Sequence, residues 1–462
     1  MSGLDIASIV IIILALLLLG GLLKFISSLI SRKSDVFNFE RDHEEALYKP
    51  TYKRKKPEKE STMIGLGVSK KDVYVPNDAK HVFICGTTGS GKTIAISNFL
   101  KSGAEYDYPM LIIDGKGDTD SGSLLELTKE ICKDRKVYVI NLNEPATSDK
   151  YNPFKNTNAD IVKDMLINMT KWSEEHYKYN TECYILRLCK LLEFKEIGIS
   201  LENLTKYLPI VSFIKLSTDL SKIGQISKEE HLADIDLAKT SGSIAESAAA
   251  RFTTIKESSL GQIFDESGID IYSALEENAI IIFILNPLLY PEMSPLIGNL
   301  IIIDSKKAVS NFYHHKKNRI FYILDEINVY ASASLLDLVN KSRSANITCI
   351  LATQSLSDLD KVSPEFKEQI IENCNNYIVL RQNSSVNAEH WSNIIGTRVT
   401  MQATYQIRGE NGEAKSTDLG SLRKTREYIY HPDDIKLLTT GTAIFLSRDE
   451  MYHAKIKVNK PF

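Results

Sequence analysis

The pattern of apolar and polar residues along this chain predicts a series of short buried strands separated by helices. Short apolar runs, bounded by polar or turn-forming residues, are typical of strands buried on both faces of a parallel sheet. Stretches with helical spacing of apolar residues fill most of the gaps, and this alternation favours an α/β domain built around one parallel sheet. The runs occupy residues 81–85, 109–114, 136–142, 279–285, 319–327, 347–354 and 377–381.

The block formed by residues 159–272 interrupts this alternation. It contains no strand-like run, and its apolar residues recur at helical spacing, as at Ile161 and Met165. A block of more than a hundred residues is too long to be a loop within a compact domain. We therefore predict an all-α domain that is inserted between two parts of the α/β domain, residues 62–158 and 273–462.

The C-terminal part of the chain, from about residue 397 to 460, is β-rich. The sequence GENGE at 409–413 is typical of a turn between two strands. Two further β-like runs, at 442–446 and 452–458, predict a final pair of strands.

The N-terminal segment predicts a membrane anchor. Residues 6–23 form an uncharged apolar run that spans roughly 27 Å as a helix, enough for the hydrocarbon core of a membrane. A signal peptide is the rival interpretation, but no basic region precedes the run and no cleavage site is obvious. Arg32 and Lys33 follow it, so the positive-inside rule places the rest of the chain in the cytoplasm. We predict a single-pass anchor in the inner (cytoplasmic) membrane, residues 1–30, and a cytoplasmic linker, residues 31–61.

Charge and cysteine content exclude few classes of protein. The net charge of −3 gives no global basic field of the kind that marks many nucleic-acid binders, although a local channel could still carry basic residues. The six cysteines include no C-x-x-C pair and no spacing that fits a zinc site. These features indicate a reduced, cytoplasmic main body.

A phosphate-binding motif follows the first predicted strand. The sequence GTTGSGKT fits the pattern G-x-x-x-x-G-K-T, in which backbone N–H groups wrap phosphates. We expect Lys92 to reach the β- and γ-phosphates, the Thr93 hydroxyl to bind Mg²⁺, and the following helix to direct its N-terminus at the same phosphates. The predicted nucleotide-binding residues are Gly86, Thr87, Thr88, Gly89, Ser90, Gly91, Lys92 and Thr93.

A carboxylate pair completes the predicted ATPase site. Asp325 and Glu326 stand at the end of the apolar run RIFYILDEI, where ligands bind in open parallel α/β sheets. Asp325 fits the magnesium role, and Glu326 fits the general base that polarises the attacking water. The two motifs together predict a RecA-like P-loop ATPase that uses ATP and Mg²⁺.

At this point the chain resembles the type IV secretion coupling proteins of the TraD/TraG group. The resemblance rests on the ordered motifs HVFICGTTGSGKT, IIDGKGD, KYNPF, FYILDE, ILATQSLSDL and NCNNYIVLR. It implies a motor that delivers DNA, with an attached relaxase, to a conjugative type IV secretion channel. It also implies a homo-hexamer whose partners are single-stranded DNA, the relaxosome, the channel proteins and the inner membrane.

The resemblance implies roles for individual residues. Gln354, at the end of its strand, corresponds to a sensor of the γ-phosphate, although a polar strand end needs no such role. Arg343 matches the family's arginine finger, which acts on the ATP of a neighbouring subunit; the alternative is a solvated helix end. Arg381 is a second candidate for that role. For Asp114 and Lys116, a functional role and simple turn chemistry stay equally open.

The chain departs from the family pattern in two respects. Only one transmembrane helix is visible and no acidic C-terminal tail follows, so substrate selection would fall to residues 159–272.

Two other functions stay open. One alternative is an FtsK/HerA-like translocase on double-stranded DNA, which the absence of a helix–turn–helix pattern disfavours. The other is an ATP-switched docking receptor for secreted proteins, which Glu326 and Arg343 disfavour because a switch needs slow hydrolysis.

Overall fold

The computed structural model describes residues 22, 60–67, 70–78, 80–169, 174–314, 319–410 and 413–461. The predicted anchor and linker therefore lie almost entirely outside the described residues. Within the described ranges, no helix is both long and apolar enough to span a membrane. The described chain forms two compact units, one with residues 389–434 and a larger one with the residues before and after that segment.

The larger unit is built on one mixed sheet of eleven strands, in the order β2-β1-β13-β12-β9-β3-β8-β7-β4-β6-β5. The seven strands from β9 to β5 run parallel to one another. The other four pair in antiparallel fashion. The strands are β1 (Ser61–Gly67), β2 (Asp72–Pro76), β3 (His81–Cys85), β4 (Met110–Asp114), β5 (Val137–Asn141), β6 (Ile280–Ile284), β7 (Ile320–Asp325), β8 (Ile347–Thr353), β9 (Cys374–Val379), β12 (Thr442–Ser447) and β13 (Tyr452–Val458).

The expectation of one parallel sheet is correct for the centre and wrong for one edge. The strands β1 and β2 were not predicted, because their short, half-exposed sequences lack a continuous apolar run. Their place in the sheet depends on β13, to which β1 pairs from the other end of the chain. Such a long-range pairing has no local signal in the sequence.

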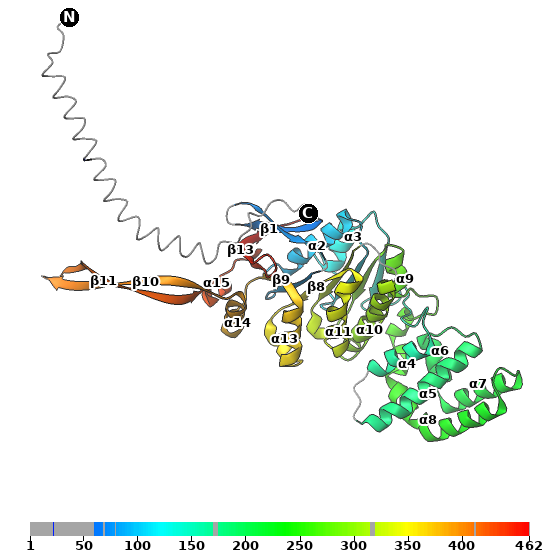
Figure 1. The fold of residues 1–462 in the computed structure, drawn as a ribbon. Helices are drawn as coiled ribbons and strands as arrows, with labels where there is room; N and C mark the ends of the chain where they lie inside the picture. The colour runs from blue at the N-terminus through cyan, green and yellow to red at the C-terminus, as the bar shows by residue number, and fades with distance from the viewer. Residues whose placement is uncertain are drawn as a thin grey trace, which may run out of the picture. The chain divides into compact units, whose positions relative to one another are not determined.

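Helices cover both faces of this sheet (Figure 1). On one face, α2 packs against α3, and on the other α10, α11 and α13 pack in series. The central strands are buried on both faces, as their apolar runs predict. The helices concerned are α2 (Lys92–Glu105), α3 (Leu124–Ile131), α10 (Met293–His314), α11 (Ala333–Ser342), α12 (Leu356–Asp360) and α13 (Pro364–Asn373), with 3-10 turns η2 (Ile327–Val329) and η3 (Arg343–Ala345).

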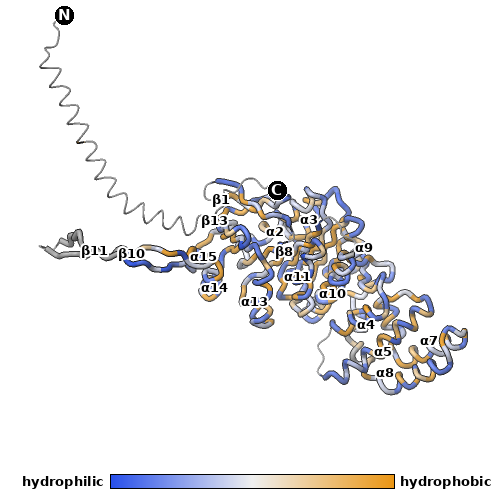
Figure 2. Tube along the Cα trace, in the orientation of Figure 1, coloured by the Kyte–Doolittle hydropathy of each residue, from blue (hydrophilic) through white to orange (hydrophobic). Residues whose placement is uncertain are grey.

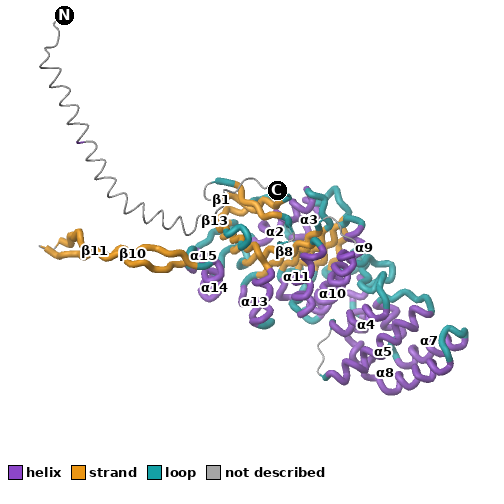
Figure 3. The backbone as a smooth tube through the Cα atoms, viewed as in Figure 1, coloured by secondary structure: helices purple, strands orange, loops and turns teal. Residues whose placement is uncertain are grey.

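The described residues between β5 and β6 contain helices and no strand (Figure 3). Tyr184 and Phe213 stack with ring centroids 4.5 Å apart in the interior of this segment. In Figure 2 its helices alternate between hydrophobic and hydrophilic colouring, as expected when one side of a helix is buried. That the segment is a separate domain stays a prediction. Its helices are α4 (Ala159–Asn168), α5 (Glu175–Phe194), α6 (Leu201–Tyr207), α7 (Ile210–Lys222), α8 (Lys228–Glu257), η1 (Ser259–Ile263) and α9 (Ile271–Glu276).

The KYNPF motif forms the root of this helical segment. The backbone of Tyr151 makes bridges to Phe264 and Ile269, so the chain entering the segment pairs with the chain leaving it. The Tyr151 hydroxyl donates a 2.9 Å hydrogen bond to Asp304 on α10. Lys307, one turn further along α10, pairs with the same carboxylate at 2.9 Å. The motif therefore has a structural role that the sequence did not indicate.

The smaller unit contains a separate two-stranded antiparallel sheet, β10 (Thr397–Glu410) with β11 (Glu413–Tyr428). Glu410 pairs with Glu413, so the predicted turn is consistent with the observed register. The helices α14 (Ser385–Ile395) and α15 (Pro432–Lys436) precede and follow this hairpin in the chain.

Candidate functional site

The phosphate-binding loop joins β3 to α2 and is held by backbone hydrogen bonds. Gly86 N–H donates to Thr353 at 3.2 Å, and Thr87 N–H donates to Arg381 at 3.1 Å. Gly91 precedes α2 with φ 107°, a backbone conformation that favours glycine. No side chain caps α2, so its first N–H groups are available to an anion.

Lys92 lies between two carboxylates at the start of α2. It forms an ion pair with Glu326, and its Nζ is 3.5 Å from Asp325 Oδ1. All three side chains are at most 10% exposed, so these charges interact through a medium of low polarity. Burial lowers the pKa of Lys92, but the two carboxylates outweigh it and the net pKa is raised. Lys92 is therefore positively charged at neutral pH, where the phosphate-binding loop joins α2.

The carboxylate pair stands at the C-terminal end of β7, as predicted. Glu326 adopts left-handed backbone angles of φ 48° and ψ 54°, which cost about 1–2 kcal/mol for a residue with a side chain. The Tyr330 hydroxyl donates a 2.9 Å hydrogen bond to the Asp325 carbonyl and holds the bend. Burial raises the pKa of Glu326 more than the charge of Lys92 lowers it. A raised pKa suits a group that accepts a proton from water.

A third carboxylate, Asp114, lies beside Asp325 on the neighbouring strand β4, where the two residues are in register. Burial and the charge of Asp325 raise the pKa of Asp114 to about 7. Its Oδ1 accepts hydrogen bonds from the N–H groups of Lys116 (2.8 Å) and Gly117 (3.3 Å). The structure thus gives Asp114 a turn-forming role, and a catalytic role stays open.

Gln354 reaches the same carboxylate as Lys92. It follows β8, which lies between β3 and β7. Its Nε2 donates to Glu326 Oε1 at 3.1 Å, and its Oε1 accepts from the Thr88 hydroxyl at 3.5 Å. Gln354 thus connects the phosphate-binding loop to Glu326, and its role as a sensor stays a prediction.

The two candidate arginines lie at opposite ends of the parallel strands. Arg343 is exposed and precedes β8, so it lies at the N-terminal ends of the parallel strands, away from the phosphate-binding loop. Arg381 follows β9, and its carbonyl accepts hydrogen bonds from both N–H and hydroxyl of Thr87. Its Nε is buried and has no hydrogen-bond partner among the described residues. Within one chain the structure brings Arg381, and not Arg343, to the site.

One element of the site was missed by sequence reasoning. Gly441 N–H donates to the Ser90 carbonyl at 2.9 Å, and the Thr440 hydroxyl donates to the Gly89 carbonyl at 3.1 Å. A Cβ on Gly91 would lie 3.3 Å from the backbone nitrogen of Gly441. The segment before β12 therefore supports the phosphate-binding loop from outside. Only the glycine in TTGT hints at a turn there, and nothing local reveals its neighbour.

The residues present fit ATP and Mg²⁺. The Ser90 hydroxyl is buried inside the loop and has no hydrogen-bond partner among the described residues. Thr93 and Asp325 are candidate magnesium ligands, since Mg²⁺ is usually held by one or two protein oxygens, waters and substrate phosphates. No group of three His, Cys, Asp or Glu side chains in the described ranges could hold a metal.

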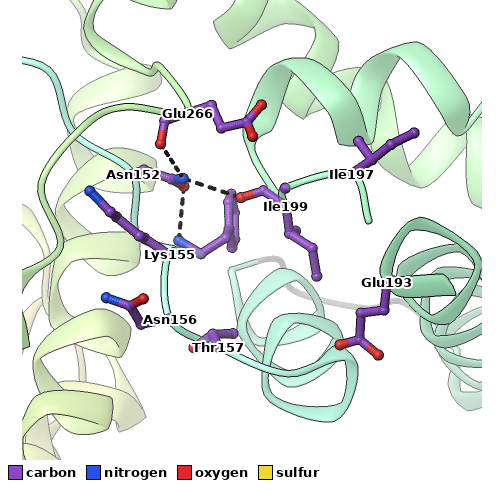
Figure 4. A pocket seen from close by; sticks show the side chains of 10 residues that line it. Asn152, Lys155, Asn156, Thr157, Glu193, Ile197, Ile199 and Glu266 are labelled. Carbon is purple, nitrogen blue, oxygen red and sulfur yellow. Dashed lines mark hydrogen bonds between the residues drawn. The ribbon is translucent and has the colours of Figure 1, made fainter. Parts of the chain in front are cut away.

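A cavity of about 390 Å³ lies elsewhere, at the root of the helical segment (Figure 4). Asn152 of the KYNPF motif lines it and donates to the carbonyls of Ile199 (3.2 Å) and Glu266 (3.4 Å). None of the phosphate-site residues lines this cavity. It belongs to the junction between the sheet and the helices.

The mixed α/β sheet, the phosphate-binding loop after β3 and the carboxylates after β7 define the class of the RecA-like P-loop ATPases. Two family models match this chain: "Type IV secretory system Conjugative DNA transfer" over residues 33–183, and "TraM recognition site of TraD and TraG" over residues 319–440. The chain belongs to the type IV coupling proteins of the TraD/TraG group, and the resemblance seen in the sequence is confirmed.

Solved structures share the fold. The bacterial conjugative coupling protein TrwB superimposes with a TM-score of 0.63 at 18% identity, covering 88% of this chain and 90% of that one. TrwB structures include complexes with ADP and Mg²⁺ and with a non-hydrolysable ATP analogue. VirB4 of Thermoanaerobacter pseudethanolicus gives a TM-score of 0.54 at 11% identity, covering 87% of this chain and 97% of that one.

Sequence relatives are shorter. An uncharacterized protein of Mycoplasma pneumoniae is 30% identical over 105 residues, which is 22% of this chain and 70% of that protein. A second uncharacterized protein of the same organism is 28% identical over 93 residues, 16% of this chain and 78% of that protein.

Proposed function

We propose that this protein is an ATP-driven motor that delivers DNA, with a relaxase attached, to a conjugative type IV secretion channel. The observation that carries the proposal is the contact of Lys92 with both Asp325 and Glu326, within a chain of the coupling-protein family. ATP and Mg²⁺ are its cofactors, as the nucleotide complexes of TrwB support.

The chain's own groups account for hydrolysis. Backbone N–H groups of residues 86–91 and the Lys92 ammonium bind the phosphates, and Thr93 with Asp325 holds the metal. Mg²⁺ supplies charge neutralisation when bound. Glu326 holds the attacking water and takes its proton, for which its raised pKa suits it. Lys92 and Gln354 both contact Glu326. A phosphate that binds Lys92 therefore also changes the surroundings of the base.

We also propose that six copies assemble into a ring in which Arg343 acts on the neighbouring subunit's ATP. Its exposure and its distance in the fold from the chain's own phosphate-binding loop support a role between subunits. Arg381 is the alternative, acting within its own subunit. Residues 6–23 would anchor each subunit in the inner membrane with the bulk in the cytoplasm, and residues 159–272 would select substrates.

The test is ATP hydrolysis by the full chain with single-stranded DNA, with double-stranded DNA and without DNA. We expect stimulation by single-stranded DNA, and its loss in Glu326→Gln. The matched control is Glu130→Gln, an exposed carboxylate on α3, which should hydrolyse ATP like the natural chain. Hydrolysis that Glu326→Gln leaves intact would refute the assignment of the site.

The two alternatives give different results in the same experiment. A translocase of the FtsK/HerA type would respond to duplex DNA only. A docking receptor would bind a secreted protein tightly, with no affinity for DNA at any salt concentration.

A further inference from the structure

The base of the β10–β11 hairpin carries a concentration of positive charge that the ATPase site does not use. Among the twelve residues 397–402 and 423–428 are four cations and one carboxylate, Glu427, within a chain whose net charge is −3. The four cations are all exposed, and none forms an ion pair with a carboxylate of the described residues. We call them the hairpin cations; they are Arg398, Arg423, Lys424 and Arg426.

The register divides the hairpin cations between the two faces of the ribbon. Arg398 pairs with Glu427 and Gln402 pairs with Arg423, and alternate residues share a face, so Arg398 and Arg423 lie on one face. A 2.9 Å hydrogen bond from Gln402 to Glu427 on that face agrees with this assignment. Lys424 and Arg426 occupy the opposite face.

The sole carboxylate in this region does not cancel the charge. Glu427 accepts the hydrogen bond from Gln402 and lies on the face of Arg398 and Arg423. On the other face, Arg426 donates a 3.2 Å hydrogen bond to the Thr397 hydroxyl, which holds the guanidinium without neutralising it. Each face therefore presents net positive charge.

The spacing and shape of this ribbon suit a nucleic-acid backbone. Lys424 and Arg426, two residues apart on one strand, are separated by about 6.8 Å, close to the spacing of neighbouring phosphates in one nucleic-acid strand. A two-stranded β-ribbon fits into the major groove of duplex DNA, where it has a phosphate backbone on either side. A flat anionic lipid surface would contact one face only and leave the other two cations unused.

We propose that the base of the β10–β11 hairpin (Figure 1) binds the phosphate backbones of duplex DNA, with the hairpin cations of its two faces contacting the two backbones. The inference deepens the proposed function, on which it rests for DNA as the partner. It adds a contact outside the ATPase site and specifies the strand form that this contact takes.

The experiment measures affinity of the full chain for duplex DNA as a function of salt concentration. The variant Arg423→Gln/Lys424→Gln/Arg426→Gln removes three cations and keeps side chains that strands tolerate. If each contacts a phosphate, the slope of log K against log[salt] should become shallower by about 2.7, at roughly 0.9 per contact. ATP hydrolysis without DNA should not change, because none of the three belongs to the ATPase site.

Two controls separate contact from net charge. The variant Lys129→Gln/Lys133→Gln/Lys460→Gln removes three exposed lysines from the larger unit and should keep the natural slope. The variant Arg423→Lys/Arg426→Lys keeps the charge and should retain most of the slope. Equal thermal melting of all variants shows that the ribbon and the rest of the fold are intact.

Three results would overturn the proposal. A hairpin variant with the natural slope on duplex DNA excludes the contact, and a change confined to single-stranded DNA excludes the duplex. Loss of binding to vesicles containing an anionic lipid, with DNA binding intact, assigns the cations to the membrane. If the natural chain binds no DNA of either form, the proposed function fails as well, so the two failures are distinguishable.

Discussion

Two clusters of buried charge in the larger unit are balanced in different ways. At the phosphate site, Asp325 and Glu326 share the single ammonium of Lys92, and Asp114 lies beside Asp325 with no cation of its own in the interior. Burial, together with the negative charge of Asp325, raises the pKa of Asp114 to about 7. The buried part of the site therefore holds more negative than positive charge.

At the root of the helical segment, the buried carboxylate of Asp304 pairs with one ammonium and has a second buried carboxylate, Asp270, near it. Asp304 and Lys307 pair at 2.9 Å, and Lys307 also donates to the carbonyls of Pro153 (2.9 Å) and Lys155 (3.1 Å). The second oxygen of Asp304 accepts from the Tyr151 hydroxyl. Asp270 also accepts hydrogen bonds from protein groups, so both carboxylates are bonded within the fold, although burial raises the pKa of Asp304.

The two clusters therefore differ in role: one is suited to binding a ligand and the other to stabilising the fold. A buried ion pair whose ammonium also bonds backbone carbonyls fixes one arrangement of the chain, whereas adjacent carboxylates at a strand end beside a phosphate-binding loop are stabilised further when cations bind. The largest expected effect of mutation is therefore on activity at the first cluster and on stability at the second.

Lys92→Ala tests the first cluster most strongly. Loss of the ammonium should lower the rate of ATP hydrolysis on the order of 10²–10³-fold, because no other side chain of the loop can stabilise the phosphate charge. The measurement is steady-state hydrolysis. Lys101→Ala, at a partly exposed lysine on the same helix α2, is the control and should hydrolyse at the natural rate. A rate for Lys92→Ala within twofold of natural would contradict the assignment.

Lys307→Met tests the second cluster. It leaves the buried carboxylate of Asp304 unpaired and should lower the free energy of unfolding by about 3–5 kcal/mol in urea denaturation. Lys306→Met removes a neighbouring, partly exposed cation and should cost less than about 1 kcal/mol. The double variant Lys307→Met/Asp304→Leu should recover most of the loss. A small effect of Lys307→Met would mean that the pair is not a structural anchor.

Asp114→Asn tests the imbalance through pH. The folded state raises the pKa of Asp114 from its ordinary value of 3.8 to about 7. Its stabilising contribution is therefore fully present below about pH 4 and is lost as the pH rises through 7. Asparagine cannot ionise, so at pH 8 the free energy of unfolding of the variant should exceed that of the natural chain by roughly 2–4 kcal/mol, and its melting temperature should be higher.

The control for this pH effect is Asp118→Asn. Asp118 forms a hydrogen bond with Lys116 that holds its pKa below the ordinary value, so it is ionised in both states above pH 5. Thermal melting at pH 5.5 and pH 8 should show no change in pH dependence for this variant. Equal behaviour of the two asparagine variants would contradict the raised pKa of Asp114.

Tyr151→Phe should have the smallest effect. It removes one buried hydrogen bond to Asp304 and should lower the free energy of unfolding by about 1–2 kcal/mol. Tyr177→Phe, at an exposed position on α5, is the control and should unfold like the natural chain. A larger loss than that of Lys307→Met would reverse the order of importance within the root.

Sequence reasoning predicted the centre of the molecule well. The strands β3, β4, β6, β7 and β8 are near-continuous apolar runs because both of their faces are buried, and such runs are legible without a structure. The edge strands β1 and β2 were missed because their pairing with β13 is decided at long range. The contacts of Thr440 and Gly441 with the phosphate-binding loop were missed for the same reason, because they join residues far apart in the sequence.

The phosphate-binding loop and the carboxylate pair could be located from residue types alone, because both depend on fixed local spacing beside a strand end. The folded arrangement of the strands was needed to show that Arg381 lies beside the loop while Arg343 lies at the opposite ends of the parallel strands. It also decided the balance of the two charge clusters. Charge balance depends on which strands become neighbours, and the order of strands in a sheet is set by packing over the whole chain rather than by any local pattern.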